Sequence, residues 1–409
     1  MIRTILAVSL GLVACAPSPE VPAERISESE NSLGRWEIDS PAGPFSFAPN
    51  LLAVGDHLIL SWLEQSELPS GDPYHRLLVS RLIAGSWSAP AVVAEGADFF
   101  ANWADIPAVA AAADGSLYAH WLAKTGTDTY AYSIFLARSV DEGASWTPMG
   151  PLNDDDTLTE HGFVSFVTQG EGVRAFWLDG RQMADGGPMN VRTAMVTQEV
   201  GLSEVLDDRV CECCATDAAI TGQGPVVVSR DRSDEEIRDI VVVRQIGDSW
   251  TESERIAADE WRIEGCPVNG PAVAAAGDKV AAVWYTAGGS GPRVQLALSM
   301  DAGATFGSPQ IVDGSRPLGR VDLVDDGSGG FLASWLEGAD ETAEIRLRRF
   351  DGTGSGSEPT MVARTSVSRA SGFPRLARVG DQLFLAWVDI ESEETSRVRV
   401  LEIPVSAIN

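Results

Sequence analysis

One pattern recurs seven times along the chain and constrains its fold more than any other feature. Each copy has a short apolar run, a turn with Gly and Asp, and a second apolar run that ends in tryptophan, as in Pro271–Trp284. The recurring positions are Trp62, Trp121, Trp177, Trp284, Trp335 and Trp387, with Arg230 at the equivalent position of the fourth copy. They lie 59, 56, 53, 54, 51 and 52 residues apart. Strand-like runs at this period predict an all-β, seven-bladed β-propeller whose tryptophans pack between adjacent blades.

The two ends of the repeat region are predicted to meet. The seventh copy has three strand-like runs, the last from Arg397 to Pro404. The stretch Arg35–Asp39 can supply its missing outer strand. Pairing the N-terminal strand with the last blade would close the ring and remove an exposed sheet edge.

The N-terminus has the features of a targeting segment. Arg3 precedes an apolar run, Ile5–Ala14, that is too short to span a bilayer and ends at Cys15. This resembles the lipobox of bacterial lipoproteins, which implies cleavage before Cys15 and acylation of that cysteine, with an ordinary signal peptide as the alternative. We therefore expect a signal peptide over 1–14, an acylated Cys15 with a flexible tether over 15–34, and a propeller over 35–409. The expected location is the bacterial cell envelope, at the outer membrane.

The charge of the chain limits its partners. It has 59 acidic against 30 basic residues and a formal net charge of −29. This argues against nucleic acid, which needs a basic surface, and against electrostatic docking on an anionic membrane. An acidic, solvated surface is the simplest interpretation.

Two turns carry a motif of the form S-x-D-x-G-x-[S/T]-[W/F]. Its members are Ser139, Asp141, Gly143 and Trp146 in one turn, and Ser299, Asp301, Gly303 and Phe306 in the other. These turns resemble Asp-boxes, and the chain resembles the sialidase-like (BNR/Asp-box) β-propeller superfamily, in particular exported members named exo-alpha-sialidase by fold. The resemblance implies a structural role for the motif, and it makes a six-bladed sialidase-type ring the alternative to seven blades.

Four cysteines beyond the N-terminal segment form the least ordinary feature of the sequence. They are Cys211, Cys213, Cys214 and Cys266. They precede the innermost strands of neighbouring copies, so we expect them to be close in space. Exported thiols usually oxidise, which favours two disulfides, one of them joining the loop to Cys266. The alternatives are a thiolate site for copper or zinc, with His161 as a further ligand, or a strained redox-active bridge.

Propellers bind ligands at the mouth of the central channel, where the innermost strands begin. The candidate ligand-binding residues there are Asp105, His161, Asp179, Arg181, Asp217, Arg230, Asp231, Arg232, Asn269, Arg320 and Arg375. Arg230 replaces a buried tryptophan and needs a partner, for which Asp231 or Asp217 could serve. Its alternative role is in an arginine clamp for a carboxylate or phosphate. The run 154–156 of three aspartates offers ligands for calcium, although an exposed acidic loop is the simpler interpretation.

Resemblance to sialidases implies an arginine triad, a tyrosine paired with a glutamate, and an acid/base aspartate. The stretches that match the first arginine motif, Phe45–Pro49, Asp105–Pro107 and Gly372–Arg375, all lack that arginine. The sequence therefore assigns no catalytic residue. We expect an envelope-anchored module that binds a ligand, a metal or a protein at the channel mouth, without sialidase activity. The partner would be a glycan, a small anion or an envelope protein. The alternatives are a glycoside hydrolase of sialidase type and a copper-handling or redox protein.

Overall fold

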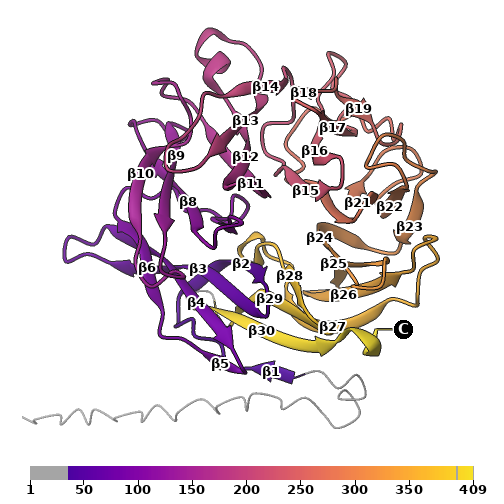
Figure 1. Cartoon of the computed structure of the whole chain (residues 1–409). Coiled ribbons are helices and arrows are strands. Elements are labelled where there is room, and N and C mark those ends of the chain that lie inside the picture. Colours follow the sequence, from indigo (N-terminus) through magenta and orange to yellow (C-terminus); the bar gives the residue numbers. More distant parts are fainter. Residues whose placement is uncertain (1–35, 393–394, 409) are drawn as a thin grey trace, which may run out of the picture.

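Seven antiparallel sheets surround a central axis in the computed structural model (Figure 1). The structure describes residues 36–392 and 395–408, so the predicted signal peptide, Cys15 and the tether lie outside the described residues. The prediction of a seven-bladed, all-β propeller is confirmed, and the six-bladed alternative is wrong. In the described part of the chain, no helix has the length and apolar character needed to cross a bilayer.

Each blade is built from strands that follow one another in the chain. The first three blades contain β2 (Ser46–Val54), β3 (His57–Glu67), β4 (Pro73–Ile83), β5 (Ser86–Trp87) and β6 (Ala91–Gly96); β7 (Val109–Ala111), β8 (Leu117–Lys124), β9 (Tyr132–Ser139) and β10 (Thr147–Pro151); and β11 (His161–Gln169), β12 (Gly172–Asp179), β13 (Asn190–Val196) and β14 (Glu204–Asp207). The next two contain β15 (Asp217–Thr221), β16 (Gly224–Arg230), β17 (Ile240–Ile246), β18 (Ser249–Trp250) and β19 (Glu254–Arg255); and β20 (Ala272–Ala276), β21 (Lys279–Thr286), β22 (Arg293–Ser299) and β23 (Gln310–Asp313). The last two contain β24 (Pro317–Asp325), β25 (Phe331–Ala339), β26 (Thr342–Phe350) and β27 (Thr360–Ser366); and β28 (Arg375–Val379), β29 (Gln382–Ile390) and β30 (Ser396–Pro404). The described residues also form three 3-10 turns: η2 (Arg181–Asp185), η3 (Arg369–Ser371) and η4 (Val405–Ala407).

The ring closes as the sequence predicts. Strand β1 (Trp36–Ile38) pairs antiparallel with β30, Trp36 opposite Glu402 and Ile38 opposite Val400. The last sheet therefore has the order β1-β30-β29-β28 and joins the two ends of the described chain. The edge that β30 would otherwise expose is covered.

The repeated tryptophans hold adjacent blades together. Trp62, Trp177, Trp284 and Trp335 are fully buried, and each packs against the preceding blade. Their indole N–H groups donate to carboxylates at 2.7–3.0 Å, from Glu64, Asp179, Asp259 and Asp313 respectively. The fold thus satisfies the one polar atom of each of these four rings, whereas the indole nitrogen of the buried Trp387 has no partner among the described residues.

The two Asp-box turns lie between the third and fourth strands of their blades. The Asp141 carboxylate accepts hydrogen bonds from the Ser139 hydroxyl and the Ser145 N–H at 2.8 and 2.9 Å. Asp301 does the same with Ser299 and Thr305. Gly143 has φ +85°, a left-handed conformation that glycine adopts without strain. These contacts are internal to the turns.

The innermost strands are joined near the channel mouth by side chains that cap the next blade. Asp105 accepts the Phe163 N–H at 2.8 Å. Three further side chains accept a backbone N–H of the next blade in the same way, at 2.7–2.8 Å: Asp217 from Val273, Asn269 from Arg320, and Asp322 from Leu376. A Cβ at Gly162 would lie 2.0 Å from the Asp105 carboxylate, so glycine is needed there. Asp105, Asp217 and Asn269, three candidate ligand residues, therefore hold the hub together.

Candidate functional site

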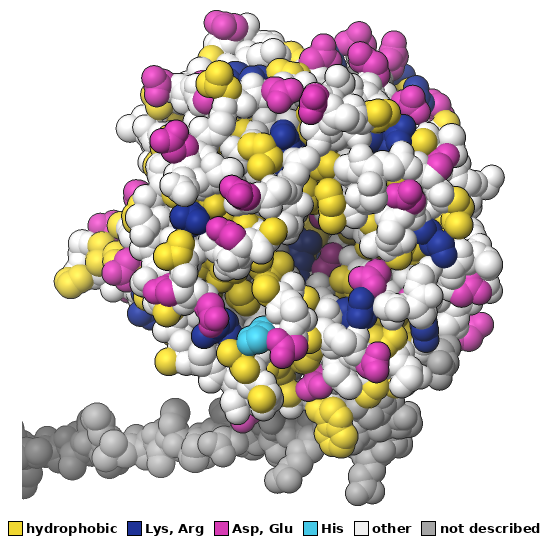
Figure 2. All heavy atoms as spheres, in the orientation of Figure 1, with side chains coloured by type: hydrophobic (Ala, Val, Ile, Leu, Met, Phe, Trp, Pro, Cys, Tyr) yellow, Lys and Arg dark blue, Asp and Glu magenta, His cyan; other side chains and the backbone are white. Residues whose placement is uncertain are grey.

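The four cysteines converge where the fourth and fifth blades begin. Cys211, Cys213 and Cys214 precede β15, and Cys266 precedes β20, the innermost strand of the next blade. Viewed along its axis, the molecule is hollowed at the hub and acidic side chains are scattered over its surface (Figure 2). Because equivalent segments of neighbouring blades are adjacent in a propeller, residues about fifty positions apart meet here.

The sulfur atoms form one cluster. Cys211 Sγ lies 3.3 Å from Cys214 Sγ and 3.9 Å from Cys213 Sγ. These three sulfurs all lie within 4.8 Å of one another. Cys266 contacts Cys213, and each alters the pKa of the other. All four thiols are free, so the expectation of two disulfides is not met in this structure.

The cluster has dimensions that suit a metal ion. A metal bound to each sulfur at about 2.3 Å, with tetrahedral angles, separates the sulfurs by about 3.8 Å. The observed distances of 3.3 and 3.9 Å bracket that value. Thiolates select soft d¹⁰ ions such as Cu(I) and Zn(II). Small side-chain adjustments would therefore place three sulfurs around one ion.

A buried ion network supports the cysteine loop. The Arg238 guanidinium is 3% exposed and donates to Cys211 Sγ at 3.2 Å, to Glu212 at 3.1 Å and to Glu236 at 2.8 Å. Arg232 pairs with the same two glutamates. Two arginines thus balance two glutamates and fix the loop. The sequence analysis did not single out Arg238 and Glu212; the available signal was the mixed run of arginines and acidic residues over 230–239, after the cysteines.

Arg230 is held by backbone atoms. It is 1% exposed. Its guanidinium donates to the carbonyls of Arg238, Asn269 and Tyr285 at 2.7–3.0 Å and lies 4.8 Å from the centre of the Trp261 ring. The contacts with Asn269 and Tyr285 tie the fourth blade to the fifth. Four N–H bonds are used in this way, so Arg230 is not available as an anion clamp.

The predicted partners of Arg230 are wrong. Within 36–392 and 395–408, no carboxylate lies at ion-pair distance from it; Asp231 accepts the Arg232 N–H instead, and Asp217 caps the next blade. Arg230 lies close enough to Cys211 and Cys214 to favour their thiolates. A buried charge needs compensation, and a thiolate in the cluster would supply the counter-charge.

The thiols differ in acidity. Contacts with Cys213 and Cys214, followed by the charges of Arg230 and Arg238, lower the pKa of Cys211 well below that of an ordinary thiol, although burial opposes them. Burial raises the pKa of Cys214 to about 12. Contacts with its neighbours raise the pKa of Cys213. The lowered pKa of Cys211 favours its thiolate, which is the form that binds metal ions, and any further thiol would have to lose its proton to act as a ligand.

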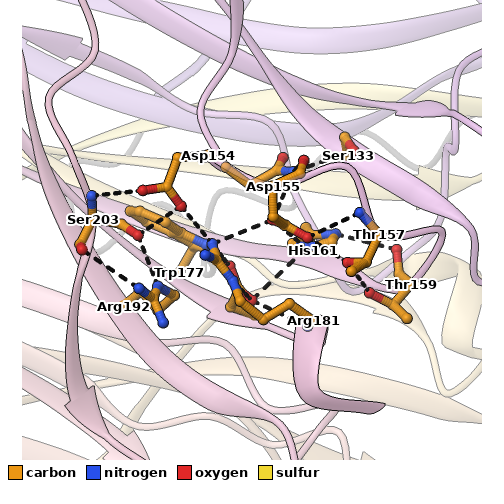
Figure 3. A network of polar contacts seen from close by, with 12 residues as sticks. Ser133, Asp154, Asp155, Thr157, Thr159, His161, Trp177, Arg181, Arg192 and Ser203 are labelled. Atoms are coloured by element: carbon orange, nitrogen blue, oxygen red, sulfur yellow. Dashed lines mark hydrogen bonds and ion pairs between the residues drawn. The ribbon is translucent and has the colours of Figure 1, made fainter. Parts of the chain in front are cut away.

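His161 belongs to a different network, in the third blade (Figure 3). Its Nε2 lies 3.1 Å from Asp155 and 3.8 Å from Asp179, and it is grouped with these carboxylates rather than with the cysteines. Burial opposes protonation, but the two carboxylates outweigh it and raise the pKa of His161. The expectation that His161 joins the cysteines is therefore wrong.

One arginine is shared by three carboxylates of this network. Arg181 contacts Asp179 at 2.7 Å, Asp154 at 2.8 Å and Asp155 at 3.2 Å (Figure 3). Its guanidinium already pairs with three carboxylates, so Arg181 is engaged within the protein rather than free to clamp an external anion. The network joins the second and third blades.

The residues that a sialidase would need are present only in part. Tyr132 donates to Glu160 at 2.6 Å, the type of pair that sialidases use. However, Tyr132 is 1% exposed and stacks on Phe100, with ring centres 3.9 Å apart. Its hydroxyl is not placed to attack a substrate.

No arginine triad forms among Arg230, Arg320 and Arg375. One nitrogen of Arg320 donates to Ser368, Ser371 and Gly372, and its guanidinium lies over Trp103. Burial, with a smaller effect of Arg369, lowers the pKa of Arg320 to about 10. Arg375 lies 3.9 Å from Asp322. Arg230 and Arg320 are therefore engaged by the ring itself, whereas Arg375 makes one long ion pair and its buried Nε has no hydrogen-bond partner in the part of the chain that the structure describes.

An open groove of about 1060 Å³ is lined by residues of the first and seventh blades and of the connection that leads to the second blade. Its lining includes Phe47, Gln65, Glu67, His75, Asn102 and Trp103. None of the charged candidate residues lines it. Sequence reasoning did not single out this groove.

Comparison with known proteins gives structural likeness only. No protein-family model matches the chain, and no curated protein matches it. A protein of unknown function from Dyadobacter fermentans is 14% identical with a TM-score of 0.52, covering 90% of this chain and 98% of the other. Polysaccharide lyase Uly1 is 9% identical with a TM-score of 0.54, covering 88% and 90%.

A sialidase is also similar in structure. Trypanosoma rangeli sialidase in complex with the inhibitor DANA is 12% identical with a TM-score of 0.50. The match covers 90% of this chain and 59% of the sialidase. At these identities the likeness concerns architecture and carries no activity. The chain has the fold of the sialidase-like β-propellers.

Proposed function

We propose that this propeller is a binding module that holds one thiophilic metal ion, Cu(I) or Zn(II), at its channel mouth. The observation that carries the proposal is the cluster of Cys211, Cys213 and Cys214, whose sulfurs all lie within 4.8 Å of one another. Three thiolates are a typical donor set for these soft ions. The catalytic groups of a sialidase are buried or engaged, which favours a binding role over hydrolysis.

Charge supports the same assignment. Three thiolates and one d¹⁰ cation leave a net negative charge in a buried site, which is costly unless it is compensated. Arg230 has no carboxylate partner in the described residues, and Arg238 donates directly to Cys211. The buried guanidiniums therefore suit an anionic metal–thiolate centre.

The test is metal binding by the purified full chain, reduced and kept under anaerobic conditions. We expect one Cu(I) or one Zn(II) per chain, measured in separate titrations by competition with a coloured chelator. Cys211→Ser should weaken binding more than about 100-fold, because losing an outer-sphere partner alone costs about 10–100-fold. Asp155→Asn, in the other group of potential ligands, is the matched control and should keep wild-type affinity.

Two results would overturn the proposal. One is a reduced wild-type protein that binds neither ion stoichiometrically. The other is loss of binding in Asp155→Asn with normal binding in Cys211→Ser. Alkylation of the denatured, unreduced protein adds an independent check: the proposal expects free thiols at all three ligand positions, whereas disulfides would leave them unlabelled.

We also propose that the chain is exported and anchored to the envelope by an acylated Cys15. The support is the sequence Leu12-Val13-Ala14-Cys15 after a charged and then apolar segment. In a bacterial host, labelled fatty acid should enter the wild-type protein, and Cys15→Ser should abolish both the label and the membrane association. A membrane-bound, unlabelled wild-type protein would refute the anchor.

A further inference from the structure

The four thiols are graded in exposure from solvent to interior. Cys266 is exposed, Cys213 is half-buried, and Cys211 and Cys214 are each 1% exposed. Cys266 contacts Cys213, and Cys213 is 3.9 Å from Cys211. The sulfurs therefore form a continuous series in which only one end meets bulk water.

The backbone on either side of Cys266 is constrained differently. Three residues along the chain, the Asn269 carbonyl accepts two N–H bonds from Arg230, and the Asn269 side chain caps Arg320. On the other side, a Cβ at Gly265 would meet nothing within 4 Å. Cys266 thus stands on an anchored segment with open space at its exposed side.

We propose that Cys266 is the entry ligand of the metal site: it takes a thiophilic ion from an external donor and passes it through Cys213 to Cys211 and Cys214. This rests on the proposed function and adds a direction of transfer to it. Resting metal is held by the three inner thiolates, and Cys266 returns to solvent once transfer is complete.

The transfer is a ligand exchange without redox change. Cys266 forms a metal–sulfur bond as the bond to the external donor breaks, and its thiol proton passes to the departing donor or to water. Cys213 then replaces the external ligands in the same way. Because each step forms one metal–sulfur bond before the next is broken, the ion is never released into the acidic surroundings of the mouth.

The experiment is the rate of metal transfer from a coloured chelator to the full chain, followed by stopped flow. In Cys266→Ser we expect uptake and release to slow at least about tenfold, equal to about 1.4 kcal/mol in the barrier, with the dissociation constant unchanged within about threefold. Glu264→Gln, two residues away and exposed, is the matched control for charge in the same loop and should keep wild-type rates.

A second measurement does not depend on any variant. In the metal-loaded wild-type protein, Cys266 should remain open to an alkylating reagent while Cys213 is protected, as read by mass spectrometry. Unchanged transfer rates in Cys266→Ser, or loss of affinity as large as that of Cys211→Ser, would overturn the entry role. Protection of Cys266 in the loaded state would do the same and make it a resident ligand. A wild-type chain that takes up no metal overturns the proposed function itself, and the entry role with it.

Discussion

Replacing Arg230 by methionine is expected to lower the free energy of unfolding by about 3–5 kcal/mol. Methionine fills a similar volume, but it leaves the carbonyls of Arg238, Asn269 and Tyr285 without their donors in a site that is 1% exposed. Each orphaned buried carbonyl costs about 1–3 kcal/mol. Chemical denaturation followed by tryptophan fluorescence measures the loss.

Two further substitutions make this result interpretable. Arg364→Met removes a guanidinium that is 58% exposed, and it should change stability by less than about 0.5 kcal/mol. Arg230→Lys keeps the positive charge but loses the planar set of N–H donors, so this variant should also be substantially less stable than the wild type. If Arg230→Met were no worse than Arg364→Met, the backbone contacts at this position would not hold the fourth and fifth blades together.

Asp105→Asn is expected to change the pH dependence of stability. Asp105 is 3% exposed and accepts one backbone N–H. Burial, with a contribution from Glu160, raises its pKa to about 8, against about 3.9 in an unfolded chain. Between these values the folded state keeps a proton that the unfolded state has lost. The stability that this group provides is thus present below about pH 4 and is lost as pH rises towards about pH 8.

The asparagine variant cannot ionise and still offers an oxygen to the Phe163 N–H. Its stability relative to wild type should therefore rise between about pH 5 and about pH 8, with a slope of up to about 1.4 kcal/mol per pH unit. Denaturant midpoints measured at several pH values give the difference directly. Asp98→Asn removes one charge from an exposed position in the same connection and controls for net charge. A difference independent of pH would mean that Asp105 is ionised in the folded protein.

The fold could be predicted because the pattern of apolar, buried positions repeats along the sequence. A tryptophan in the second strand marks each blade, and six of the seven positions keep it. The closing strand followed from counting the runs of the last copy. The proximity of Cys213 and Cys266 followed from their equivalent places in neighbouring blades. These features depend on where a residue lies within its repeat, and that position can be counted directly in the sequence.

The side-chain contacts of the candidate site could be predicted less well, for a physical reason. Arg230 is satisfied by carbonyls, which every residue has, so no sequence signal marks its partners. His161 begins the innermost strand of its blade, close to the position that the cysteines have before theirs, yet Asp155 and Asp179 hold it in the third blade. The direction of a side chain and its local ion pairs decide which cluster a residue joins. The period of the repeat carries no information about either.

The closure of the ring by β1 also has a mechanical side. The described chain enters the molecule at Trp36, directly at the joint between its first and last segments. Tension applied to the preceding residues along the axis of β1 would bear on three backbone pairs at once, in shear, before it reached any other blade. The joint that completes the propeller is thus also the point at which an outside force would be transmitted to it.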